Sequence, residues 1–216
     1  MKTSSRIISW VFVPLLTPLY GLMAALFIPS AQDFLEMGRD CLYDEPMTRK
    51  WGLVYFFFFF GSVVPAIAFA FLKFSGLIST IEIDDRKERG LPIIIMLVSC
   101  VLLFASALYG TRDNVNDSKF ILSYPLAGII STGIFFIMTL WKKVSLHAGG
   151  VGIMTGYIIA YLAVHVEFAA WLVPASVLVS GLVMSARVYL EKHTLQEVFI
   201  GWTTGAVVSF LVNYLY

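Results

Sequence analysis

Seven apolar stretches, each about as long as a helix that crosses a membrane, account for most of this chain of 216 residues. They cover residues 7–29, 52–72, 91–109, 120–140, 148–164, 169–186 and 195–215. A bilayer core requires about 20 apolar residues per helical span, and only helices or closed barrels satisfy the backbone in lipid. Because these runs are continuous rather than alternating, they favour helices. We therefore predict an all-α, polytopic membrane bundle of about seven transmembrane helices.

The composition indicates the same class of protein. Hydrophobic residues make up 59% of the chain and charged residues only 13%, about half of what a soluble domain carries. No segment between the spans is long enough for a soluble domain, so residues 1–216 are predicted to form a single membrane-embedded domain. The net charge of +1 indicates no nucleic-acid partner. No His/Cys group has metal-ligand spacing, so neither metal nor other cofactor is expected.

The first apolar stretch, residues 7–29, follows the sequence MKTSSR and could be taken for a signal peptide. Its length and its two prolines, Pro14 and Pro18, favour a retained and kinked span instead; cleavage would leave six spans. Two GxxxG pairs, in residues 152–156 and 201–205, predict that helices approach closely there. We interpret the phenylalanine run at 56–60 as lipid-facing or packing surface.

Polar residues gather in three clusters, at residues 81–92, 142–150 and 185–202. Two predicted spans separate the first cluster from the second, and two more separate the second from the third. An even number of crossings returns the chain to the same side of the membrane. The three clusters are therefore predicted to lie on one side, where they can form a common site.

The third cluster has the residue types of an anion site with a reactive imidazole. His193 and Glu197 are four residues apart, which on a helix places them on one face, so the carboxylate can fix the imidazole tautomer. Arg187 is six positions before His193, so the two converge only if the helix breaks between them. Glu191 and Lys192 mark the expected turn. A guanidinium presents a planar fork of donors that suits phosphate oxygens.

The sequence SARVYLEKHTLQEVFIGW (185–202) resembles the third signature of the type-2 phosphatidic acid phosphatase superfamily, SRxxxxxHxxxD followed by an apolar helix. Arg187, His193 and Glu197 fall on its three functional positions, with Glu in place of the usual Asp. Ser185 is one residue further from the arginine than in the pattern, because Ala186 intervenes.

The other two clusters resemble the remaining signatures of that superfamily less closely. The segment VSLHAGG resembles the PSGH signature through Ser145 and His147, with Val144 and Leu146 in place of Pro and Gly. The first signature, KxxxxxxRP, is matched in residue types but not in spacing, by Arg86, Lys87, Arg89 and Pro92.

The resemblance implies a membrane-embedded phosphatase that works without a metal ion. It implies that His193 attacks phosphorus and forms a phosphohistidine, that Glu197 orients it, and that His147 protonates the leaving alkoxide. The phosphate would be held by Arg187, by some of Arg86, Lys87 and Arg89, and by Ser145. Family members commonly have six spans, whereas here two apolar stretches, 91–109 and 120–140, lie between the first two signatures. Because two spans restore the side of the membrane, we expect the site to assemble nevertheless.

A site at the boundary of lipid and water suits a lipid phosphate or diphosphate of the phosphatidate, phosphatidylglycerophosphate, undecaprenyl diphosphate or lipid A class. We expect an integral protein of the bacterial inner membrane. Ten of the fifteen Lys and Arg residues lie on the cluster side, which by the positive-inside rule faces the cytoplasm, whereas the family resemblance implies an outward-facing site. That side, the particular lipid and the oligomeric state are left open. Two other functions also remain open: an inactive relative that binds anionic lipid, and a small transporter.

Overall fold

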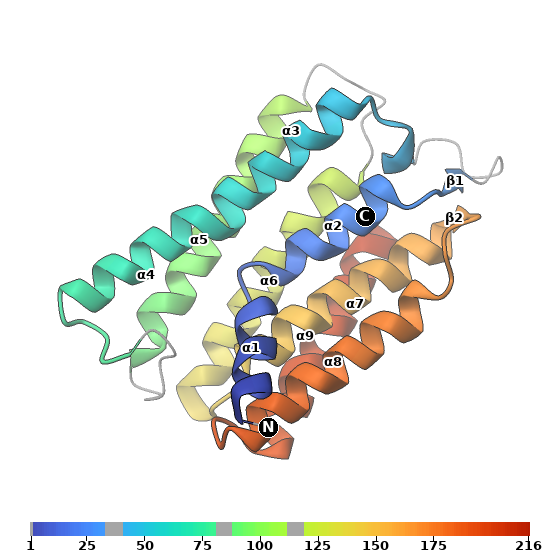
Figure 1. Ribbon diagram of the computed structural model, residues 1–216. Helices are drawn as coiled ribbons and strands as arrows, with labels where there is room; N and C mark the ends of the chain where they lie inside the picture. The colour runs from blue at the N-terminus through green and yellow to red at the C-terminus, as the bar shows by residue number, and fades with distance from the viewer. Residues whose placement is uncertain (1, 33–40, 81–87, 112–118) are drawn as a thin grey trace.

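The computed structural model describes residues 2–32, 41–80, 88–111 and 119–216, which form an all-α bundle (Figure 1). Six helical segments are long and apolar enough to cross a membrane. The first runs from Met47 to Phe74 as α3 (Met47–Phe58), the π-helical turn η2 (Phe59–Val63) and α4 (Val64–Phe74). The others are α5 (Gly90–Gly110), α6 (Phe120–Trp141), α7 (Leu146–Val164), α8 (Leu172–Tyr189) and α9 (Leu195–Leu215). The predicted polytopic membrane bundle is thus confirmed.

The first apolar stretch, predicted as one kinked span, is two separate helices. These are α1 (Lys2–Val11) and α2 (Thr17–Phe27), and Pro14 lies in the break between them. Proline has no N–H to donate, and Pro18 sits in the first turn of α2, the position where a helix tolerates it. An 11-residue helix is only about 16 Å long, too short to cross a bilayer core of about 30 Å alone. Together α1 and α2 still run from one end of the bundle towards the other (Figure 1).

Three short elements, two strands and a 3₁₀ turn, lie at the opposite end of the bundle. The strands β1 (Ala31–Gln32) and β2 (His165–Val166) pair antiparallel beyond the ends of α2 and α7. A 3₁₀ turn, η1 (Leu42–Asp44), precedes α3. In the phenylalanine run, Phe57 is buried while Phe59 is half exposed, so the run serves both packing and the outer surface as predicted.

Helices α7 and α9 pack backbone against backbone at the centre of the bundle. A Cβ added at Gly152 would overlap the carbonyl oxygen of Trp202, and one at Gly205 would overlap that of Gly149. The predicted close approach of the GxxxG helices is therefore confirmed. At the same contact, the backbone N–H of Ser145 donates to the carbonyl of Glu197 at 3.3 Å. Glycine packing thus fixes the start of α7 against the first turn of α9.

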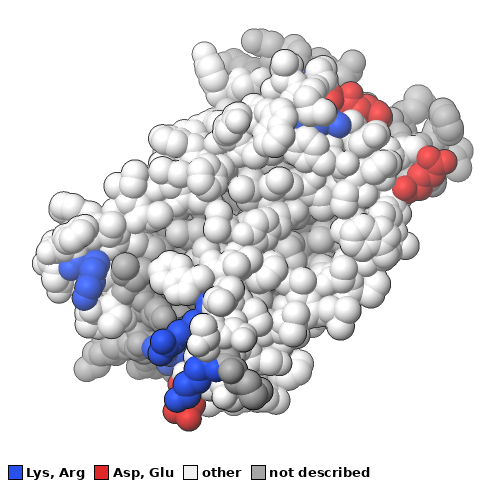
Figure 2. Space-filling model, in the orientation of Figure 1, with Lys and Arg blue, Asp and Glu red and all other residues white. Residues whose placement is uncertain are grey.

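The starts of α5, α7 and α9 lie at the end of the bundle where the N-terminus and α1 lie (Figure 1). This arrangement agrees with the prediction that the three polar clusters lie on one side of the membrane. Figure 2 shows Lys, Arg, Asp and Glu side chains at the two ends of the visible face, with an uncharged belt between them. Such a belt is the surface expected of a protein whose middle lies in hydrocarbon.

Candidate functional site

The chain breaks between Arg187 and His193 as the sequence predicts. Helix α8 ends at Tyr189, and Glu191 adopts a left-handed conformation with φ of 56°. The N–H of Lys192 then donates to the carbonyl of Arg187 at 3.1 Å, which closes the helix end. This reversal directs the chain back into the bundle. Arg187 at the end of α8 and His193 just before α9 thus reach the same region.

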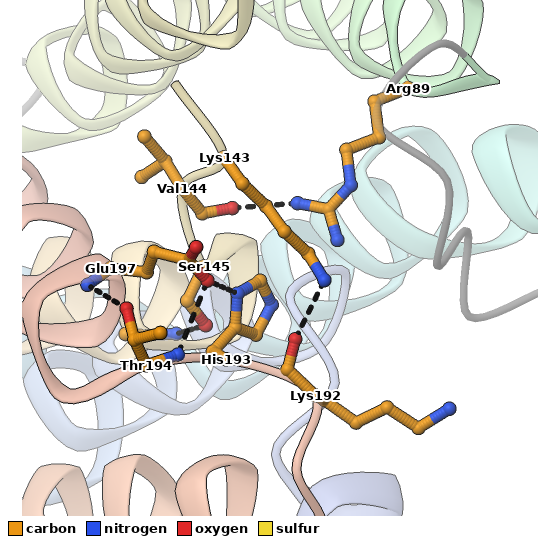
Figure 3. Close-up of polar contacts among 9 residues, drawn as sticks. Arg89, Lys143, Val144, Ser145, Lys192, His193, Thr194 and Glu197 are labelled. Carbon is orange, nitrogen blue, oxygen red and sulfur yellow. Dashed lines mark hydrogen bonds and ion pairs between the residues drawn. The ribbon is translucent and has the colours of Figure 1, made fainter.

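His193 and Glu197 are joined, but not across the face of one helix. His193 lies before α9, whose N-cap is Thr194. Glu197 and Thr194 form a capping box, in which each side chain binds the other's backbone N–H at 3.3 Å. The same Glu197 Oε2 accepts from His193 Nδ1 at 2.8 Å (Figure 3). The expectation of a shared helical face was therefore wrong: the capping box positions the carboxylate.

His193 is held as a neutral imidazole. Burial first, and then the positive charges of Arg89, Arg187 and Lys143, together lower its pKa from 6.5 to about 2. A neutral ring that donates Nδ1–H to Glu197 carries its lone pair on Nε2. That tautomer is the nucleophilic form of histidine.

The loop before α7 connects the first and second clusters. Arg89, the N-cap residue of α5, donates from Nη1 to the carbonyl of Val144 at 2.9 Å. Ser145 is fully buried and caps α7, with its hydroxyl accepting from the N–H of Ala148 at 3.4 Å. Ser145 therefore fixes the start of the helix that carries His147. Ser145, predicted as a phosphate ligand, thus has a structural role as the N-cap of α7.

Four of the predicted site residues line one cavity of about 320 Å³. They come from all three clusters: Arg89 from the first, His147 from the second, and Arg187 and His193 from the third. Arg89 and Arg187 are only 5% and 3% exposed, so both guanidinium groups are largely removed from water. Buried cations of this kind attract an anion strongly, because the low dielectric strengthens the interaction. Arg86 and Lys87 lie outside the described residues.

Two features of the site were not predicted. Lys143 donates from Nζ to the carbonyl of Lys192 at 2.8 Å, next to His193 (Figure 3). In the sequence, only the position of Lys143 within the second cluster points to a role at the site. A lysine at the end of a span is equally typical of an interfacial anchor. Helix α1 supplies the second feature: its Trp10 lines the cavity that also contains His147. The amphipathic N-terminal helix thus forms part of the site.

The cavity brings two buried guanidinium groups together with two imidazoles. Among the described residues, no group of three or more His, Cys, Asp and Glu side chains could hold a metal ion. Comparison with known proteins adds no family: no protein-family model, curated protein or solved structure matches the chain. The class is therefore defined by the fold and the cavity alone. The protein is a membrane-embedded helical bundle with a buried, cationic, two-histidine cavity near one end.

Proposed function

We propose that this protein is a membrane lipid phosphatase that works through a phosphohistidine and without a metal ion. The observation that carries the proposal is the state of His193. Its imidazole is neutral, is oriented by the Glu197 carboxylate, and lines a cavity that also contains two buried guanidinium groups and a second imidazole. A nucleophile, its orienting base and cationic phosphate ligands are the parts that phosphoryl transfer requires.

In the proposed reaction, Arg89 and Arg187 bind the phosphate oxygens and offset their negative charge. The Nε2 lone pair of His193 attacks phosphorus while the bond to the lipid oxygen breaks. Glu197 stabilises the positive charge that develops on the ring. His147, whose protonated form is favoured by the bound phosphate, gives its proton to the departing alkoxide.

In the second half of the reaction, water replaces the lipid alcohol. Neutral His147 accepts a proton from that water, whose oxygen attacks the phosphorus of phosphohistidine. The N–P bond breaks and His193 regains its lone pair, while His147 is again protonated beside the bound phosphate. Both residues are then as they were when the substrate was bound, and inorganic phosphate leaves.

The proposed substrates are lipid phosphates and diphosphates of the four classes named above. An amphiphile of this kind carries a charged group for the guanidinium end and hydrocarbon for the apolar walls. Those walls come from α1, α4 and α5 and include Trp10, Phe69 and Met96. A soluble sugar phosphate would leave such walls unmatched.

The experiment is phosphate release from a panel of these four lipid classes, in detergent, with and without vanadate. We expect at least one lipid to be hydrolysed in a vanadate-sensitive reaction, and His193→Ala to lower the rate by roughly 10³-fold or more. His165→Gln is the matched control, because His165 is also buried but contacts Tyr161 at the opposite end of the bundle. It should keep most of the activity.

Three results would contradict the proposal. Equal turnover by His193→Ala would remove the nucleophile. Binding of lipid phosphate by the wild type, with no release from any of the four classes, would favour a non-catalytic lipid-binding protein. Substrate-dependent flux in sealed vesicles without phosphate release would favour a transporter.

A further inference from the structure

A second, deeper cavity adjoins the site cavity. This deeper cavity has a volume of about 70 Å³. Both cavities are lined by the same four residues, Pro14, Leu15, Met96 and Leu146. The two cavities therefore adjoin; we call the pair, which extends from Arg89 and His193 into the bundle, the passage.

The deeper cavity is apolar and follows the helix axes. Along α7 its lining runs from Leu146 through Gly150 to Ile153. At about 1.5 Å per residue this is roughly 10 Å, a large part of one leaflet of a bilayer core about 30 Å thick. The rest of the wall includes Cys100 of α5 and Tyr124 of α6. The passage thus has a cationic end and a hydrocarbon-like end, in the order found in an amphiphile.

Two irregularities in the helices make room for this passage. The break between α1 and α2 places Pro14 and Leu15 in the wall of both cavities. The π-helical turn η2 contributes Gly61 to the wall of the deeper cavity, and its Ser62 hydroxyl donates to the carbonyl of Leu15 at 2.7 Å. This hydrogen bond satisfies an acceptor that the break leaves free. Single π-turns within α-helices are frequent at functional sites.

We propose that the deeper cavity binds the first part of one hydrocarbon chain of the lipid whose phosphate lies between Arg89, Arg187 and His193. This inference rests on the proposed function and adds where the lipid chain lies. The narrow volume admits a single chain, so a two-chain lipid keeps its second chain in the bilayer. The chain gains little by leaving one apolar medium for another. Its binding instead fixes the depth and direction of the phosphate, which is a positioning effect.

The structure offers a matched pair of substitutions to test this. Gly61 in η2 lines the deeper cavity, and a Cβ added there would meet no described atom within 4 Å. Gly181 in α8 is equally open, and it is not among the described residues that line either cavity. Gly61→Leu adds a branched side chain at the wall of the deeper cavity, whereas Gly181→Leu adds the same side chain elsewhere in the membrane.

The first measurement is kcat/KM for hexadecyl phosphate and for butyl phosphate. We expect Gly61→Leu to lower kcat/KM for hexadecyl phosphate by about tenfold or more and to leave butyl phosphate within twofold. Gly181→Leu should leave both within twofold. Equal kcat/KM of the two variants on hexadecyl phosphate would overturn the inference.

The second measurement does not depend on turnover. A hexadecyl phosphate that carries a diazirine in its chain should label peptides of α5 and α6 in the wild type and in Gly181→Leu, and lose that labelling in Gly61→Leu. Labelling of the same peptides in all three proteins would overturn the inference. If labelling follows the expected pattern but no protein releases phosphate, the chain site stands and the proposed phosphatase function fails.

Discussion

Glu197 Oε2 lies 2.8 Å from His193 Nδ1 and 3.3 Å from the backbone nitrogen of Thr194. One carboxylate oxygen therefore starts α9 and orients the imidazole at the same time. This double contact explains why a glutamate suits position 197, where the signature that the sequence resembles has an aspartate. Glutamate at the third helical position is the usual partner in a capping box.

Glu197→Gln separates the two contacts. The amide oxygen can still accept from Thr194, so we expect the melting temperature to change little. The neutral amide cannot stabilise a positive charge on His193, so kcat should fall roughly 10²-fold or more. Thr194→Ala is the complementary variant: it should cost about 1 kcal/mol of stability through the lost cap and lower kcat by less than tenfold. Thermal unfolding and phosphate release distinguish these outcomes, and a larger loss of activity in Thr194→Ala than in Glu197→Gln would contradict the assignment.

The depressed pKa of His193 predicts how the residue reacts across pH. An ordinary histidine with a pKa near 6.5 is mostly protonated at pH 5, which reduces its neutral fraction about thirtyfold. Because burial, Arg89 and Arg187 lower the pKa of His193 to about 2, its ring stays neutral over the same range. Acylation of His193 by diethyl pyrocarbonate, followed by mass spectrometry of its peptide, should therefore be nearly constant from pH 7.5 to 5. N-acetylhistidine serves as the reference, and a parallel decline of both would contradict the shift.

Lys143 is expected to support the turn that carries His193. Its ammonium group donates to the carbonyl of Lys192 and adds positive charge beside the imidazole. Lys143→Met keeps the length of the side chain but removes both effects, so we expect kcat/KM for a lipid phosphate to fall about tenfold. Lys142→Met is the matched control, because Lys142 is exposed. The measurement is phosphate release by the two variants. If both have the same kcat/KM, Lys143 is an interfacial anchor and does not support the turn.

The sequence predicts the spans and the shared side of the clusters because both depend on length and order alone. It does not predict that residues 7–29 divide into α1 and α2. Hydropathy records how apolar a stretch is, whereas the break at Pro14 depends on lost backbone hydrogen bonds and on the acceptor that Ser62 satisfies. The π-turn at Phe59–Val63 has no periodic signal either.

Within the candidate site, local sequence motifs predict which residues take part but not which contacts they make. Arg187, His147 and His193 stand out because charged and imidazole groups are rare in so apolar a chain. The position of Arg89 in the cavity wall depends on its hydrogen bond to the carbonyl of Val144, which is 55 positions away in the chain. The cavity itself results from the packing of five segments, which no single-sequence pattern contains.

The contact between α7 and α9 links stability to the geometry of the site, and a single methyl group tests this link. Gly205→Ala places a Cβ against the carbonyl oxygen of Gly149, so the two helices must separate. Overpacking of this kind costs about 1–3 kcal/mol, which should lower the melting temperature by several degrees. Separation also weakens the hydrogen bond from the Ser145 N–H to the Glu197 carbonyl, which shifts His147 and His193 relative to each other. We therefore expect kcat to fall even at temperatures well below the unfolding transition.

Gly133→Ala is the control, because a Cβ at Gly133 of α6 meets no described atom within 4 Å and alanine favours helix. If Gly205→Ala melts like Gly133→Ala and retains its activity, the close packing of α7 on α9 is not what holds the two histidines together.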